Sequence, residues 1–198
     1  MSTKSLRLFK NDFFESLTHV HPIVPLLFWS PVVLFLLWRS IAVHELTVIQ
    51  VAAVAPLALI VWTLTEYLLH RFVFHFPARG NVGKRLVYLF HGVHHDAPND
   101  KTRLVMPPAG AVIIMALLWL LFSALIPAPW AEPFSAFFIV GYLVYDYLHY
   151  ATHHFRMRHP LLDALKRHHM QHHFTTHEAK YGVSSPLWDW VFGTLQQR

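Results

Sequence analysis

Ten of the seventeen histidines fall into four clusters, and each cluster lies beside a long apolar segment. The neutral imidazole is the commonest metal ligand in proteins. A histidine next to apolar, membrane-facing sequence is rare unless its nitrogens have a partner. Together the clusters predict a catalytic metal site that holds more than one ion at a membrane surface. The clusters are His70-x4-His75, His91-x2-His94-His95, His149-x3-His153 and His169-x2-His172-His173.

The spacing within the clusters predicts how their imidazoles converge. Residues three or four apart share a face of an α-helix, so His91 is expected to converge with both His94 and His95. The same holds for the two later clusters. Residues five apart, such as His70 and His75, point roughly 140° apart on a helix of 3.6 residues per turn. We therefore expect either that these two bind different metals or that the helix ends between them.

The number of histidines indicates which metal they bind. Divided over two ions, ten imidazoles provide about five nitrogens each. Structural zinc closes its shell with four ligands and catalytic zinc uses three and a water, so ten would be a surplus. Five nitrogens and an open position suit iron, with zinc as a possible substitute. The sequence thus predicts two iron ions and dioxygen chemistry on an apolar substrate.

Residue types that are absent exclude other chemistries. The chain has no cysteine, so thiolate metal sites, iron–sulfur clusters and disulfides are excluded. It also has no HExxH motif, which disfavours a zinc protease.

Other polar residues flank the clusters. Asp146 and Glu66 each stand about one turn before a cluster histidine, and we expect them to accept an imidazole N–H; the alternative is a helix-end charge. His154 and His168 adjoin cluster histidines and are expected to support the ligands or to face solvent. For His177 both possibilities stay open.

The composition predicts the membrane context. With 55% hydrophobic and 14% charged residues among 198, the chain is too apolar for an ordinary soluble domain. The net charge of +5 comes from basic residues scattered among histidines and aromatics. This pattern favours contact with anionic lipid headgroups and argues against nucleic acid as a partner.

We expect an all-α integral membrane protein with about four transmembrane helices and a cytosolic helical cap that holds the dimetal site. The first span is expected over about 23–43, and the second from about 47 past Glu66 to His70. The third and fourth form a hairpin within 104–145, with Trp130 and Glu132 in the turn IPAPWAEP. The fourth should continue as helix into the aqueous phase.

The whole chain, 1–198, is predicted to be one domain. Residues 1–20 include an amphipathic helix over 2–17 that lies in the membrane interface, the alternative being a partly disordered tail. Residues 21–149 hold the transmembrane helices and the first clusters, and 150–198 form the cytosolic cap with the last cluster.

The distribution of charge predicts the orientation in the membrane. If the spans are correct, fifteen of the sixteen Lys and Arg residues lie on one side, with only Arg39 at the other. The excess of basic residues marks the cytoplasmic side, and all four clusters fall on it. We expect an active site on the cytoplasmic face of a bacterial inner membrane or of the endoplasmic reticulum.

Five segments carry a resemblance to a known family: HRFVFH (70–75), FHGVHHDAPNDKTRLVMPP (90–108), GYLVYDYLHYATHH (141–154), LKRHHMQHHF (165–174) and YGVSSPLWDWVFGT (181–194). They resemble the fatty acid hydroxylase superfamily of membrane histidine-box proteins, and most closely its fatty acid 2-hydroxylase branch. The resemblance implies four spans, a cytosolic cap and a histidine-bound dimetal centre. It implies use of O2 and two electrons to hydroxylate carbon 2 of an acyl chain, free or in ceramide.

The chain departs from this family pattern in two respects. Eukaryotic members commonly carry an N-terminal cytochrome b5 domain, whereas only about twenty residues precede the first expected span here. We therefore expect electrons from a separate protein, either cytochrome b5-like or a ferredoxin with its reductase. The extra His168 also leaves open whether His168 or His169 begins the last ligand set; the spacing of the second cluster favours His169.

Two other functions fit the sequence less well. A sterol or carotenoid oxidase or desaturase of the same superfamily is disfavoured by the RLVMPP and GVSS segments. A metal transporter would place its ligands near the middle of the bilayer, whereas these clusters lie at the ends of the spans.

Overall fold

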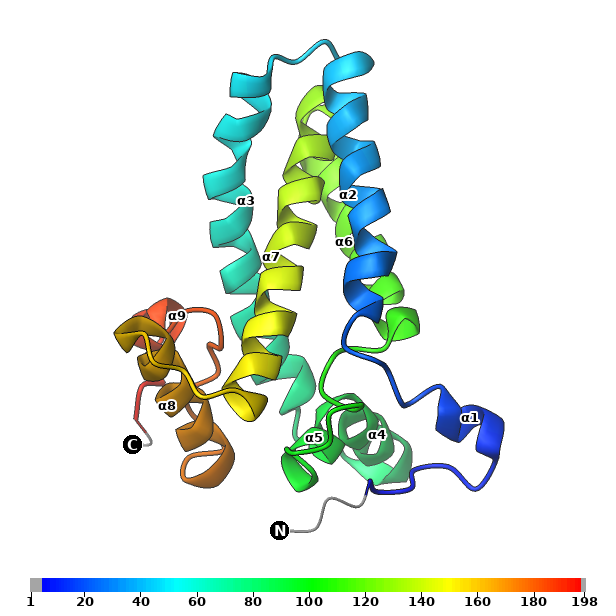
Figure 1. Ribbon diagram of the computed structural model, residues 1–198, viewed down its shortest axis with the longest axis vertical. Coiled ribbons are helices and arrows are strands. Elements are labelled where there is room, and N and C mark those ends of the chain that lie inside the picture. The colour runs from blue at the N-terminus through cyan, green and yellow to red at the C-terminus, as the bar shows by residue number, and fades with distance from the viewer. Residues whose placement is uncertain (1–4, 197–198) are drawn as a thin grey trace. The chain divides into compact units, whose positions relative to one another are not determined.

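The computed structural model describes residues 5–196, which contain helices and no strand (Figure 1). The all-α class predicted from the sequence is confirmed. The contacts divide the chain into two compact units. Unit 1 comprises residues up to 22, 63–106 and 145 onward, and unit 2 comprises 23–62 and 107–144. The helices in chain order are α1 (Asp12–Ser16), α2 (Val24–Ala42), α3 (Val48–Leu69), η1 (His70–Phe74), α4 (Gly80–Val87), η2 (Tyr88–Gly92), α5 (Val93–Asp96), α6 (Pro108–Leu125), α7 (Ala128–His154), α8 (Pro160–Phe174) and α9 (Leu187–Val191), where η1 and η2 are π-helical.

Unit 2 consists of α2, α6 and the first parts of α3 and α7, which run alongside one another (Figure 1). Aromatic side chains join these helices. Trp62 of α3 lies edge-on to Phe138 and Tyr142 of α7, with ring centroids 5.1 and 5.7 Å apart. Trp29 of α2 meets Tyr142 at 6.2 Å. Such edge-to-face pairs add about 0.5–1.5 kcal/mol each beyond the area that they bury.

Three described helical segments are long and apolar enough to cross a membrane: Val24–Ala42, Val48–Phe74 and Pro108–Leu125. These match the first three predicted spans. Helix α7, the predicted fourth span, does not meet the same criteria, so four spans remain a prediction. It does continue as helix from Asp146 to His154, as expected.

The turn between α6 and α7 is shorter than predicted. Helix α6 ends at Leu125 and α7 begins at Ala128, so Trp130 and Glu132 lie in the first turns of α7. There the Glu132 carboxylate pairs with Arg39 at 2.9 Å and approaches His44 at 3.3 Å. The prolines of this segment favoured a turn, but Pro129 is the second residue of α7, in the first turn, where proline is compatible with a helix, and α7 also continues through Pro133.

The N-terminal helix is also shorter than the predicted 2–17. Within the described residues it covers only Asp12–Ser16, and residues 2–4 lie outside them. The Asn11 side chain caps its first turn. The Leu8 and Phe9 N–H groups donate to the Glu15 carboxylate at 2.9 and 2.8 Å instead of forming helical hydrogen bonds. The N-terminal segment therefore folds around one glutamate.

Buried Arg103 ties this N-terminal segment to the loop before α6. Its guanidinium pairs with Glu15 and donates to His19 Nε2 at 2.9 Å and Ser5 Oγ at 3.0 Å. Burial alone would raise the pKa of Glu15, but the hydrogen bonds from Phe9 and Leu8 and the charge of Arg103 outweigh it and lower the pKa to about 2. Glu15 is therefore ionised at neutral pH.

Gly141 tests the packing of α3 against α7. A Cβ at this position would lie 2.6 Å from Trp62 Cγ. Helix propensity favours alanine over glycine by about 1 kcal/mol, whereas overpacking costs about 1–3 kcal/mol. Three Trp62 atoms would lie within 2.9 Å of the added Cβ, so the overpacking falls in the upper part of this range and leaves a net loss of about 1–2 kcal/mol. We expect Gly141→Ala to lower the thermal unfolding midpoint in detergent by about 2–8 °C, at about 2–4 °C per kcal/mol. The control Ala116→Val adds bulk at an exposed site on α6 and should change little; an unchanged or raised midpoint for Gly141→Ala would contradict the packing.

Candidate metal centre

The ten clustered histidines come together in unit 1 as two groups of five. Within each group the potential ligand nitrogens all lie within 4.8 Å of one another. The groups adjoin, because the ring of His95 stacks on that of His173 with centroids 4.1 Å apart. Group A is His70, His75, His91, His95 and His172; group B is His94, His149, His153, His169 and His173.

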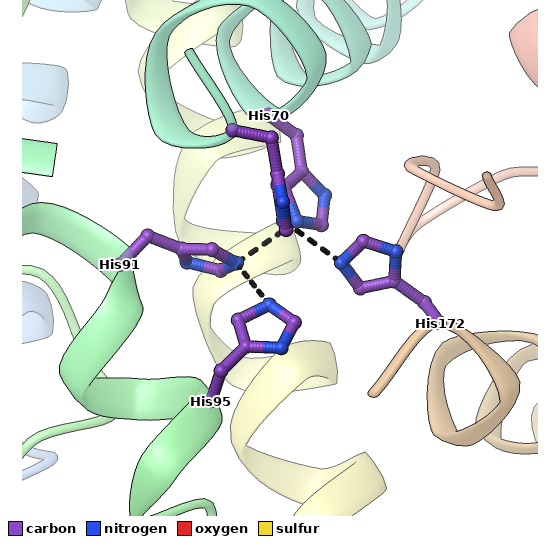
Figure 2. A group of neighbouring side chains, drawn as sticks. His70, His91, His95 and His172 are labelled. Carbon is purple, nitrogen blue, oxygen red and sulfur yellow. Dashed lines mark hydrogen bonds between the residues drawn. The ribbon is translucent and has the colours of Figure 1, made fainter. Parts of the chain in front are cut away.

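The Nε2 atoms point toward the centre of each group, as Figure 2 shows for four members of group A. In group A, His91 Nε2 lies 3.0 Å from both His70 Nε2 and His95 Nε2, and His172 Nε2 lies 3.0 Å from His75 Nε2. Group B has the same geometry. Its Nε2 separations are 3.0 Å for His94–His173, 2.9 Å for His94–His149 and 2.9 Å for His153–His169.

These contacts fit a bound metal better than they fit hydrogen bonds. His70 Nδ1 lies 2.5 Å from the Tyr181 carbonyl oxygen, and His172 Nδ1 lies 2.7 Å from that of Ala179. A carbonyl oxygen can only accept, so each Nδ1 carries the proton and each Nε2 presents a lone pair. His91 Nε2 and His94 Nε2 each have two such contacts but can donate at most one proton. Nitrogen lone pairs therefore meet in each group, and they repel one another unless a cation lies between them. An all-imidazole donor set of this size suits a transition metal such as iron or zinc.

Sequence spacing assigns the histidines to the groups by a simple rule. Pairs four residues apart share a group, such as His91 with His95 and His149 with His153. Adjacent histidines enter different groups, such as His94 and His95. Successive helical residues point about 100° apart, so one His-His dipeptide can serve two neighbouring sites.

This rule corrects the expectation that all members of one cluster converge. His91 and His94 are three residues apart, yet they lie in different groups, and His169 and His172 are separated in the same way. One face of a helix is wide enough for its side chains to reach two adjacent metal sites. Each of these clusters therefore contributes to both groups.

His70 and His75 lie in the same group, contrary to the expectation of different metals. His70 begins the π-helical turn η1 and His75 directly follows it, and the His75 N–H donates to the His70 carbonyl at 3.1 Å. This i→i+5 hydrogen bond widens the turn so that residues five apart lie on one face. The helix changes form at His70 and ends at Phe74, between the two histidines, which confirms the second alternative.

The last cluster takes the register that places His169 among the ligands. His169 is buried in group B, whereas the neighbouring His168 lies outside both groups. His168 Nε2 instead lies 3.1 Å from Asp189 Oδ2. His168 therefore contacts a carboxylate next to the centre rather than the group of ligands.

The two flanking carboxylates lie in unit 1 close to the groups, but Glu66 does not bond to His70 as expected. Its carboxylate accepts from the N–H groups of Val183 at 2.6 Å and Ser184 at 2.9 Å, and from the Ser184 hydroxyl. Asp146 accepts from the Met106 N–H at 3.4 Å. Glu66 thus holds the loop whose Tyr181 carbonyl contacts His70, and its link to that imidazole is indirect.

Sequence reasoning did not find Asp189, which is fully buried beside α8. Burial would raise the pKa of Asp189, but hydrogen bonds from His168, Thr194 and the backbone outweigh it and lower the pKa. The only signal in the sequence was its place in the segment YGVSSPLWDWVFGT, and no spacing relates it to the histidines.

The remaining histidines lie outside both groups. His177 is exposed, with its ring 5.6 Å from that of His95. His154 packs against Tyr150 at 4.5 Å, and its buried Nε2 has no hydrogen-bond partner among the described residues.

The histidines of both groups are held neutral. Burial and the neighbouring imidazoles lower the pKa of His75 to about 3 and that of His95 to about 2. In group B, burial and the neighbouring His154 and Lys166 lower the pKa of His153 to about 3. A neutral imidazole keeps the lone pair that a metal requires, so the folded chain presents its ligands ready for binding.

The register of the last cluster predicts the outcome of two substitutions. His169→Ala should abolish binding of the ion held by group B, because it removes a ligand. His168→Ala should retain most of the bound metal, since removing a supporting group costs at most about 10–100-fold in affinity. Metal analysis of the purified proteins measures both effects, and the reverse order would place His168 in the ligand set.

The lowered pKa values predict an acid-labile fold for the metal-stripped protein. Above about pH 6.5 the imidazoles are neutral in both the folded and unfolded states. Below pH 6.5 the unfolded chain binds protons at these imidazoles, whereas the folded chain binds them only near pH 3. The free energy of unfolding should therefore decrease as the pH is lowered through this window. Thermal unfolding between pH 7.5 and 5 measures this slope. His95→Ala should flatten it and exposed His159→Ala should not; a pH-independent midpoint would contradict the burial.

The chain is similar in sequence and in fold to proteins of one family. The fatty acid hydroxylase family profile matches residues 55–194. Dihydroceramide fatty acyl 2-hydroxylase FAH2 of Arabidopsis thaliana is 40% identical over 190 residues, which cover 96% of this chain and 79% of that protein. Ceramide very long chain fatty acid hydroxylase SCS7 of Saccharomyces cerevisiae is 38% identical, over 96% of this chain and 49% of that protein.

Fatty acid 2-hydroxylase of Homo sapiens is 35% identical, over 98% of this chain and 57% of that protein. This chain therefore matches about half of the length of the yeast and human relatives. A solved structure of full-length scs7p, with only the hydroxylase domain visible, superimposes with a TM-score of 0.89 at 37% identity. The match covers 96% of this chain and 71% of that one. The chain belongs to the fatty acid hydroxylase family.

Proposed function

We propose that this protein is a membrane-bound, O2-dependent hydroxylase that adds a hydroxyl group to carbon 2 of an acyl chain, either in a free fatty acid or in a sphingolipid. The observation that carries the proposal is the pair of five-imidazole groups in a chain whose relatives are named fatty acyl and ceramide hydroxylases. The balanced reaction is R–H + O2 + 2 e⁻ + 2 H⁺ → R–OH + H2O.

In this proposal groups A and B each hold one iron ion, so the ten histidines are the ligands. The chemistry that bound iron supplies is the binding and reduction of dioxygen, which amino-acid side chains cannot perform. An iron pair suits the donor set because five nitrogens leave one position open on a six-coordinate ion. Zinc can occupy the same nitrogens, so zinc in an inactive preparation would not contradict the proposal.

The chain's own residues keep the ligand imidazoles neutral, fix their orientation and limit their contact with water. The Tyr181 and Ala179 carbonyls accept the Nδ1 protons of His70 and His172, which fixes the tautomer that offers Nε2 to the metal. Seven of the ten histidines are buried, which limits water around the reacting atoms. Exclusion of water strengthens the electrostatic interactions in the centre and suppresses side reactions.

The membrane context follows from the apolar helices and the relatives. The chain is an integral membrane protein with three segments suited to spanning a bilayer. We propose that the histidine groups face the cytoplasm, because fifteen of the sixteen Lys and Arg residues lie in the N-terminal segment and in the segments that carry the clusters. The substrate carbon would reach the centre from the bilayer, and a cytoplasmic electron-transfer protein of the cytochrome b5 or ferredoxin type would supply the electrons.

The proposed reaction predicts a specific labelled product. Expressed with a reductase system in a host that lacks 2-hydroxy lipids, the protein should yield 2-hydroxy acyl lipids that carry one oxygen atom from ¹⁸O2. His94→Ala, which removes a group B nitrogen, should yield none at equal expression. Mass spectrometry of extracted free fatty acids and sphingolipids measures both the product and the lipid class that bears it.

Three other outcomes would overturn parts of the proposal. A new double bond, or hydroxylation of a ring lipid, would move the protein to another branch of the family. Label derived from water would exclude monooxygenation. Purified protein that regains turnover with zinc alone would exclude iron as the active metal.

A further inference from the structure

The two histidine groups differ in how their outward-facing nitrogens are held. In group A, carbonyls of one segment, residues 179–194 (the tail loop), contact two Nδ1 atoms. The Tyr181 carbonyl reaches His70 at 2.5 Å and the Ala179 carbonyl reaches His172 at 2.7 Å. The tail loop therefore sets the tautomer and the ring direction of two of the five group A ligands.

Group B has no such support at two of its members. The Nδ1 atoms of His169 and His173 are buried and have no hydrogen-bond partner among the described residues. An imidazole whose second nitrogen has no partner is less firmly oriented and is a weaker base toward a metal. The two groups have the same number of ligands but unequal support.

Asp189 holds the tail loop in the shape that reaches group A. Its Oδ1 accepts from the Tyr181 N–H at 2.8 Å and from the Thr194 hydroxyl at 2.7 Å. Its Oδ2 accepts from the Gly182 N–H at 2.8 Å and lies 3.1 Å from His168 Nε2. This one carboxylate thus holds both ends of the tail loop. It also holds the two peptide N–H groups that flank Tyr181, whose carbonyl contacts His70.

The loop has little freedom to adopt another shape. Lys180 has a left-handed φ of 61°, and its N–H donates to the Thr194 carbonyl at 2.8 Å. A Cβ at Gly182 would collide with the Ser185 carbonyl and lie 2.9 Å from Asp189 Oδ2. Glu66 anchors the next two N–H groups, those of Val183 and Ser184.

We propose that Asp189 is a positioning residue that makes group A the tighter of the two metal sites. It acts through the tail loop, whose carbonyls orient His70 and His172. This inference rests on the two-ion centre of the proposed function. Loss of such outer support costs about 10–100-fold in metal affinity, and the loss should fall on group A alone.

A second path from Asp189 to the metal ligands runs through its contact with His168 in α8, the helix that carries ligands of both groups. His168→Ala removes this contact and leaves the hydrogen bonds to the tail loop. It therefore separates the two routes. If the tail loop carries the effect, His168→Ala leaves the group A affinity near that of the unaltered protein.

The test is a titration of the purified full chain in detergent with Zn²⁺ against a chromophoric chelator, which measures two affinities without any turnover. Asp189→Asn keeps the size of the side chain but replaces one acceptor oxygen with a donor. We expect one dissociation constant to rise about 10–100-fold and the other to stay unchanged. The matched control is Asp163→Asn, a half-exposed α8 carboxylate paired with Arg167, which should change neither constant.

Single-site backgrounds identify the weakened site. His153→Ala disables group B and His75→Ala disables group A. Asp189→Asn should weaken the ion that remains with His153→Ala and should not affect the ion that remains with His75→Ala. Equal weakening of both ions, an effect confined to group B, or no effect would overturn the proposal.

Two further results have distinct meanings. If Asp189→Asn does not fold, Glu66→Gln loosens the same loop at its second anchor and decides the question in the same titration. A wild-type chain that binds a single ion would contradict the two-ion centre of the proposed function. Two ions that Asp189→Asn weakens alike would contradict only the role of Asp189.

Discussion

The Nε2 atoms of ten imidazoles meet at separations of about 3 Å in a largely buried volume, and the rest of unit 1 is organised around this crowding. Nitrogen lone pairs that meet in this way repel one another, and burial disfavours the protonation that would relieve the repulsion. The arrangement is therefore costly by itself and becomes favourable when cations occupy the two groups. Buried charges and polar atoms of this kind need partners, which explains why hydrogen-bonded loops surround the groups.

Local helix geometry resolves the crowding into two sites. The π-helical turn η1 puts His70 and His75 on one face, which a regular α-helix does not do. The dipeptide of His94 and His95 points its two side chains in different directions, so one short helix serves both groups. A second metal site thus requires no additional backbone element.

Carboxylates stabilise the irregular segments of unit 1. Glu66 and Asp189 accept backbone N–H groups of the tail loop, and Glu15 accepts those of the N-terminal segment. The lowered pKa values of Asp189 and Glu15 keep both carboxylates ionised, and hydrogen bonds to an ionised group are stronger than neutral ones. Residues outside regular secondary structure need such acceptors for their N–H groups. Loss of one of these carboxylates would therefore release a whole segment rather than a single contact.

The sequence by itself determined the all-α class, three apolar helices, the ten clustered histidines and the family, because apolar runs and i, i+4 spacings are local patterns. It favoured His169 over His168 by the same local argument. Tertiary structure alone decided which clusters combine to form each group, and that His70 and His75 share one, since this depends on a π-turn and on contacts between distant segments. It also decided the roles of Glu66 and Asp189, whose partners lie far away in the chain or in a loop of irregular shape. Hydrogen bonds between such distant or irregular segments produce no periodic pattern in the sequence.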